Sequence, residues 1–259
     1  MLVRPIFVAG GTNARVQLIS PGEAPRRIRY PEGWRPESKP GEIVCALFPD
    51  DNLCCEMTEP IRLPSMDVQV RERQSTDVLG HGVGWSWPRP RIIAGSALAG
   101  LIRRGELTFG IRHALALAVH PGYINADNGY DGHRWPGVPI APELIEQLGH
   151  EGNLALGSLL AIPASVDLAS LGLGNSGPGF EIARALQDYG AYVIQTTGAN
   201  AQFIASADAG LPPDIDRIVN VVIPHLRLVE NNHSRNLGGG GERRRPPAPP
   251  LLQAGTPSR

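Results

Sequence analysis

Aromatic rings and imidazoles, which can bind or transform a ligand, are concentrated in one stretch of the chain, residues 79–136. Three of the four tryptophans and four of the seven histidines lie there. The stretch is rich in glycine and proline, and large rings in such loops stay half exposed unless they contact something. We therefore predict that the functional site lies within it, although no metal-ligand spacing, nucleophile motif or phosphate-binding loop accompanies these residues.

Four side chains of this stretch are candidates for acid–base catalysis. His81 stands between two glycines, and an exposed imidazole titrates near neutral pH, as a general base should. His113 is the alternative base, and Glu106 or Tyr130 is the candidate acid. Simpler structural interpretations stand beside these: a turn residue, a buried hydrogen-bonded histidine, and a surface ion pair of Glu106 with a neighbouring arginine.

The tryptophans and two arginines fit the binding of a sugar polymer. Trp85, Trp87 and Trp135 are expected to form a platform, because the C–H faces of pyranose rings pack on indole. Arg112 and Arg134 would then bind the carboxylate of a uronate. The alternative is that the tryptophans anchor loops to the body of the protein.

The segment NADNGYDGHRWPG resembles the start of a calcium loop, with Asp127 and Asp131 as the alternating oxygen ligands. The twelfth position, however, holds Val138 instead of an acidic residue. We therefore expect no cofactor and keep calcium at these two aspartates as the alternative. A zinc site would have to combine histidines that lack the usual short spacings: His81, His113 and His133.

Composition excludes several classes of partner. The net charge is −1, from 24 basic and 25 acidic residues, so no overall field attracts nucleic acid or an anionic membrane. No stretch approaches the roughly 18 apolar residues of a membrane span. The amino terminus lacks the charged segment and apolar run of a secretory signal. The oligomeric state is left open.

The chain contains 31 glycines and 25 prolines, which indicates many turns and few long helices. Short apolar runs between turn residues favour an antiparallel β-sandwich, like a jelly roll, with a few short helices. We expect one domain over residues 1–230 and a flexible tail rich in Gly, Pro and Arg over 231–259. Strands are predicted at 3–9, 15–20, 42–48, 53–59, 67–71, 111–119, 156–162, 192–197 and 202–205, and the clearest helices at 179–189 and 213–222.

Two details of this pattern bear on function. If residues 111–119 form a strand, His113 faces the core and Arg112 lies on a face of small residues, where a helix or a ligand would fit. The three cysteines fall in one predicted hairpin, in which Cys45 and Cys54 share a face and Cys55 points the other way. A disulfide between the first two is geometrically marginal, and reduced thiols are an equal alternative.

Several motifs, taken together and in order, resemble a family of largely uncharacterised bacterial proteins, many of them exported. The matching segments are GHGVGWSW, SALAGLIRRGEL, IRHALALAV, HRWPG, GSLLAIP and ALQDYGAYV, and the likeness covers roughly residues 4–230. The chain departs from the family at WSWPRPRI, where relatives have smaller residues. The resemblance implies a β-rich fold, export and the location of the site, but no activity.

We therefore predict an extracellular or cell-surface protein that acts on or binds a polysaccharide. As an enzyme it would be a glycoside hydrolase or a polysaccharide lyase, with the acid–base and sugar-binding residues named above. The alternative from another class is a non-catalytic structural or interaction protein, such as a surface-layer, filament or virion component.

Overall fold

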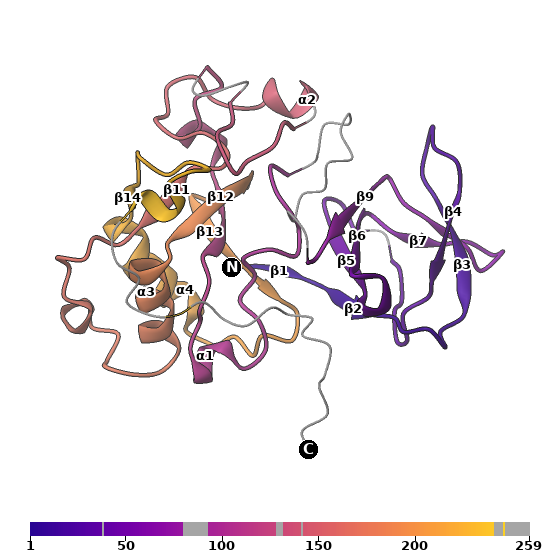
Figure 1. Cartoon of the computed structure of the whole chain (residues 1–259), viewed down its shortest axis with the longest axis horizontal. Helices are drawn as coiled ribbons and strands as arrows, with labels where there is room; N and C mark the ends of the chain where they lie inside the picture. The colour runs from indigo at the N-terminus through magenta and orange to yellow at the C-terminus, as the bar shows by residue number, and fades with distance from the viewer. Residues whose placement is uncertain (38, 80–92, 128–131, 141, 241–245, 247–259) are drawn as a thin grey trace. The chain divides into compact units, whose positions relative to one another are not determined.

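A computed structural model describes residues 1–37, 39–79, 93–127, 132–140, 142–240 and 246 (Figure 1). Contacts group these residues into two compact units, one mainly from residues 4–79 and one mainly from residues 99–240. We call them the N-terminal and C-terminal units and describe each by itself. The sequence predicts one domain over residues 1–230, because turn-rich strand patterns on both sides of residue 90 look alike.

The N-terminal unit contains two four-stranded sheets around one apolar core that includes Trp34, Leu18 and Met57. The strands of the first sheet, in spatial order, are β2 (Ile6–Val8), β5 (Ile43–Phe48), β6 (Leu53–Thr58) and β9 (Glu72–Asp77). Those of the second are β4 (Arg26–Arg29), β3 (Arg15–Ile19), β8 (Val68–Gln69) and β7 (Ile61–Arg62).

The β5–β6 hairpin has the predicted register. Phe48 pairs with Leu53 across the turn η1 (Pro49–Asp51), and Cys45 and Cys54 therefore share one face. All three cysteines are buried and free. Burial raises the pKa of the Cys55 thiol to about 12, so this thiol stays protonated at neutral pH.

The C-terminal unit is built on a six-stranded sheet. Its strands, in spatial order, are β1 (Leu2–Arg4), β13 (Ala201–Ser206), β10 (Leu115–Val119), β12 (Ala191–Thr196), β11 (Leu159–Ala161) and β14 (Arg227–Leu228). Its helices are α1 (Glu106–Phe109), α2 (Pro142–Ile145), α3 (Pro178–Asp188) and α4 (Ile215–Val222), with short 3₁₀ turns at Pro121–Tyr123, Leu168–Leu171, Ile223–His225 and Leu237–Gly239.

Helix α3 follows directly from its sequence. Ile182, Ala183 and Leu186 recur at helical spacing, and all three are fully buried in the core of this unit. Proline stands at the start of the helix, where a missing N–H costs nothing. Gly190, with a positive φ of 77°, follows its end.

The mainly β class with few short helices is confirmed, but the antiparallel topology is wrong. All three sheets are mixed, since β10 runs parallel to β12, β2 to β5 and β3 to β8. Strand propensity and turn residues are local, whereas the direction of a pair depends on which distant strand docks beside it. The sandwich or jelly-roll arrangement stays a prediction.

The strand predicted over residues 111–119 is shorter than expected. β10 begins only at Leu115, so strand alternation does not apply to Arg112 and His113. The small-residue face of β10 is also covered by the protein itself, because Ala116 and Ala118 are fully buried and the backbone of Gly100 lies against Ala116. A ligand therefore has no room there.

Side-chain amides form hydrogen bonds at the beginning of the predicted tail. Asn232 is 8% exposed and accepts a hydrogen bond from Tyr192 of β12, while Asn236 donates one to the backbone of Asn231. These side-chain amides stabilise turns in the backbone. The high Gly and Pro content, on which the prediction of a flexible tail rests, does not reveal such hydrogen bonds. Among the described residues, no helix is long and apolar enough to cross a membrane.

Candidate functional site

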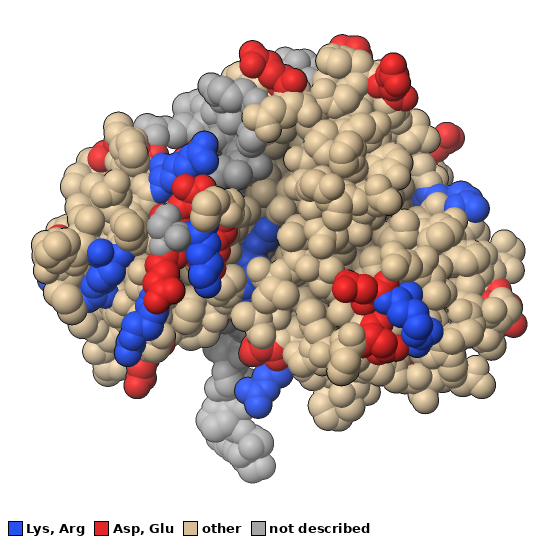
Figure 2. Space-filling view, turned by 180° about the vertical axis from the view of Figure 1, so that it is seen from behind, with Lys and Arg blue, Asp and Glu red and all other residues tan. Residues whose placement is uncertain are grey.

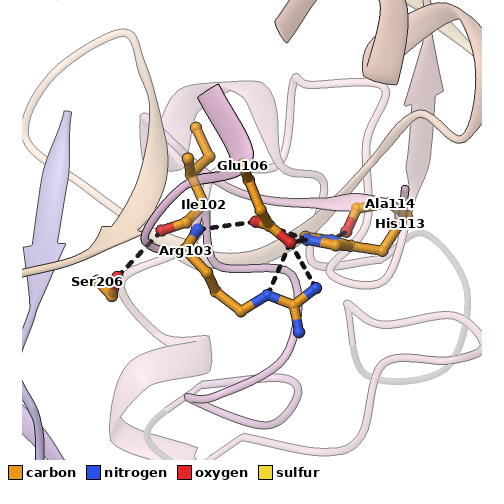
Figure 3. Close-up of polar contacts among 6 residues, drawn as sticks. All are labelled: Ile102, Arg103, Glu106, His113, Ala114 and Ser206. Carbon is orange, nitrogen blue, oxygen red and sulfur yellow. Dashed lines mark hydrogen bonds and ion pairs between the residues drawn. The ribbon is translucent and has the colours of Figure 1, made fainter. Parts of the chain in front are cut away.

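Glu106 lies at the centre of a compact polar network at the start of α1 (Figure 3). One carboxylate oxygen accepts a hydrogen bond from Nε of Arg103 at 2.9 Å and forms an ion pair with its Nη2 at 2.6 Å. The other accepts the backbone N–H of Arg103 at 2.8 Å. The predicted ion pair of Glu106 with a neighbouring arginine is thus confirmed, but the carboxylate is only 14% exposed and is not a surface group.

His113 joins the same network through its ring. Its Nε2 lies 3.1 Å from both carboxylate oxygens of Glu106, and its Nδ1 lies 2.9 Å from the carbonyl oxygen of Ala114. Both neighbours are acceptors, so both contacts are hydrogen bonds only when the ring carries two protons. A ring with two protons would make His113 a cationic partner of Glu106, and both ring nitrogens already contact acceptors within the protein.

Long-range pairing holds this network in place. Ile102 pairs with Ala205 at the end of β13, and the backbone N–H and hydroxyl of Ser206 both donate to the Ile102 carbonyl, at 2.9 and 3.3 Å (Figure 3). His113 precedes β10, the strand beside β13. Glu106 therefore ties the α1 segment to the start of the central strand.

The environment of Glu106 keeps its carboxyl group ionised. Burial raises its pKa, but the hydrogen bonds and positive charges of His113 and Arg103 outweigh burial, and the pKa falls to about 2. A general acid needs a proton at working pH, and a carboxyl group with this pKa has none near neutrality. The geometry of Glu106 therefore fits a structural ion pair better than proton transfer.

This network should make stability depend on acidity. The pKa of Glu106 lies near 2 in the folded chain and near the ordinary 4.5 in the unfolded chain, so the unfolded state takes up the proton first. The stabilisation is complete above about pH 5 and disappears as the pH falls toward 2. After allowance for solvent screening, Glu106→Gln is expected to cost about 2 kcal/mol near pH 6.

Urea unfolding of the wild type and of Glu106→Gln at several acidic pH values measures this effect. The difference between the two proteins should shrink steadily with acidification. The neighbouring Arg104 is exposed and forms no ion pair within the described part of the chain, so Arg104→Gln should leave the profile unchanged. An equal difference at all pH values would contradict the assignment.

A second candidate surface lies at the other end of the same strands. The backbone N–H of Arg134 donates to the Leu156 carbonyl at 2.8 Å, and the next residue, Gly157, donates to Val193 of β12 at 2.6 Å. Trp135 follows and is 38% exposed. Arg134 is half-buried, and no acidic side chain of the described residues pairs with it.

The predicted site residues are therefore not all together. Glu106 and His113 meet at the amino-terminal end of β10, with exposed Arg112 beside them. Arg134 and Trp135 come after the carboxyl-terminal end of β10 and lie beside residues 156–157, while α1 and α2 lie at opposite ends of the sheet (Figure 1). The remaining predicted site residues fall outside the described part of the chain: His81, Tyr130, Trp85 and Trp87.

The metal alternatives gain no support from this arrangement. Within the described ranges, no group of three His, Cys, Asp or Glu side chains could hold an ion. Asp127 pairs with exposed His150 at 3.2 Å, and Asp131 lies outside those ranges. The zinc alternative stays a prediction: His113 contacts Glu106, His133 pairs with Leu156, and His81 lies outside the described ranges.

The sequence pairs Glu106 with Arg103 or Arg104 without choosing between them, and the structure selects Arg103. The Arg-x-x-Glu spacing is a signal for this choice, because side chains three residues apart can meet across a single turn. Comparisons of the chain with protein-family models, with curated proteins and with solved structures found no match. The functional argument therefore rests on the chemistry of the residues alone.

Proposed function

We propose that the protein binds an acidic polysaccharide at the carboxyl-terminal end of β10 and β12. Trp135 would supply the platform for a sugar ring, and Arg134 would bind a uronate carboxylate. The observation that carries the proposal is an indole 38% exposed directly beside a half-buried arginine without an acidic partner among the described residues. An extracellular or cell-surface location is part of the proposal.

The position of this pair in the fold supports binding. In open sheets with parallel strands, ligands bind beyond the carboxyl ends of the strands. β10 and β12 are parallel, and the chain reaches Arg134 and Trp135 in the segment that follows the carboxyl-terminal end of β10. Aromatic stacking and arginine–carboxylate hydrogen bonds are a common means of binding an acidic sugar.

The polar network around Glu106 favours binding of the polysaccharide without its cleavage. A hydrolase or lyase that used His113 and Glu106 would first have to break their mutual contact and that of Glu106 with Arg103. Breaking a half-buried, hydrogen-bonded ion pair costs free energy that a surface-bound sugar would have to supply.

Calorimetric titration with polygalacturonate and with neutral dextran tests the proposal. Polygalacturonate should bind and dextran should bind much more weakly. Trp135→Ala should weaken binding about tenfold, which corresponds to the loss of one stacked ring. Arg134→Gln should weaken binding of the acidic polymer only.

Phe109→Ala is the matched control, because Phe109 is 83% exposed on α1 at the other end of the sheet. Its binding should equal that of the wild type. Absence of binding to polygalacturonate, or equal binding by wild type and Trp135→Ala, would refute the proposal. Cleavage of the polymer that disappears in His113→Ala would instead restore the prediction of an enzyme.

A further inference from the structure

A second polar feature lies wholly in the N-terminal unit. A pocket of about 230 Å³ opens beside β4, the edge strand of its sheet. Four arginines line it, Arg15, Arg26, Arg27 and Arg29, and Asp51 is its one acidic lining residue. The polysaccharide proposal does not use this pocket.

Positive charge in the pocket exceeds what the protein neutralises. Arg29 forms a two-armed ion pair with Asp51, at 2.8 and 3.2 Å, and Arg26 donates to the hydroxyl of Ser75 at 2.5 Å. Arg15 and Arg27 are exposed, and neither has an ion-pair partner among the described residues.

The strand register brings these charges together. Arg15 and Arg29 are direct partners across β3 and β4, a placement in which like charges repel. On the face seen in Figure 2, basic and acidic side chains lie next to one another in several places, and neither sign covers a broad area. The excess in the pocket is therefore a local feature that a bound anion would relieve.

Donor groups without acceptors also face this edge. The buried Nε of Arg29 has no hydrogen-bond partner among the residues that the structure describes, although its two terminal nitrogens pair with Asp51. Tyr30 donates its backbone N–H to Ala14, and alternation along an antiparallel pair then directs the N–H groups of Arg27 and Arg29 away from β3. Backbone and guanidinium donors of this kind bind tetrahedral oxyanions.

We propose that this pocket binds a small organic ligand that carries a phosphate or sulfate ester. Its charged oxygens would bind the arginines, and its carbon skeleton would contact the apolar part of the lining, Ile28, Phe48 and Leu53. The volume suits a compact ligand and is too small for a folded partner. Phosphate and sulfate share this chemistry, so the experiment distinguishes them.

Titration of the full chain with inorganic phosphate, inorganic sulfate, phenyl phosphate and benzoate, at constant ionic strength, tests the proposal. Phenyl phosphate should bind most tightly, because it adds apolar contact to the oxyanion. The preferred inorganic ion identifies the ester. Arg15→Gln with Arg27→Gln should weaken binding at least about tenfold, since each charged hydrogen bond to an oxyanion is strong. Both side chains are exposed, so the fold should persist.

Two further variants separate site binding from general attraction. Arg104→Gln with Arg235→Gln removes the same two charges from exposed positions in the other unit and should leave binding unchanged. Asp51→Asn removes the competing carboxylate and should tighten binding several-fold. The proposal would be overturned by an absence of saturable binding at millimolar phenyl phosphate, by equal weakening in both double variants, or by benzoate binding as tightly as phenyl phosphate.

Discussion

Replacement of Glu56 with alanine is expected to lower the free energy of unfolding by about 4 kcal/mol. Glu56 is 5% exposed, and its Oε1 accepts hydrogen bonds from the hydroxyls of Thr76 and Ser96 at 2.6 and 2.8 Å and from the N–H of Ala97 at 2.9 Å. All of these groups would lose their acceptor in a site that water does not reach. Unfolding in urea, followed by circular dichroism, measures the change.

A buried arginine increases the cost. Arg4 is 4% exposed and donates to the carbonyl of Ala97 at 2.7 Å. Burial lowers the pKa of Arg4, and the negative charge of Glu56 raises it. Glu56 therefore stabilises the charged form of the buried guanidinium. Without Glu56, the Arg4 guanidinium would stay buried without this carboxylate nearby. Most of the cost of breaking a buried ion pair comes from the charge that is left behind.

Two variants give this prediction its controls. Glu56→Gln keeps one oxygen that accepts hydrogen bonds but removes the charge, so its loss should be intermediate. Glu32 is exposed in the same unit, and Glu32→Ala should change the free energy of unfolding by less than about 0.5 kcal/mol. A loss below about 1 kcal/mol for Glu56→Ala would show that the buried network contributes little.

The second large effect is expected at Gly157, where alanine should destabilise the protein by about 3 kcal/mol or more. A Cβ at this position would overlap the carbonyl oxygen of Arg134 and lie 2.6 Å from the backbone nitrogen of Gly137. The φ of Gly157 is 89°, a conformation that strains any residue with a Cβ. Thermal and urea unfolding measure the loss.

The same substitution also tests the polysaccharide proposal, because Gly157 holds the backbone beside Arg134 and Trp135. Polygalacturonate should bind more weakly even where the variant is still folded. Gly198 is exposed, and a Cβ there meets nothing within 4 Å, so Gly198→Ala should be nearly neutral. Equal stability of the two alanine variants would contradict the close approach at Gly157.

Local patterns in the sequence predicted several elements correctly. The turn residues from Pro49 to Asn52 define the β5–β6 hairpin, and with it the shared face of Cys45 and Cys54. The spacing of apolar residues places α3 within one residue at each end. These signals succeed because a tight turn and a helical stripe depend on residues close together in the chain.

Signals of longer range were missed or misjudged. The strands predicted from the sequence do not include β4, because Arg26, Arg27 and Arg29 leave it with a single apolar residue, Ile28. Its stability comes from pairing with β3 and from burial of that isoleucine, neither of which is visible in the segment itself. The arginine pocket was missed with it.

The sequence by itself determined the β-rich class, the hairpin, the main helix and the pairing of Glu106 with a neighbouring arginine. Only the tertiary structure decided that His113 joins Glu106 while Arg134 and Trp135 lie at the opposite end of the strands, and that Arg15 faces Arg29. The physical reason is that side-chain periodicity depends on neighbouring residues. Strand order, direction and register depend on pairings between segments far apart in the chain.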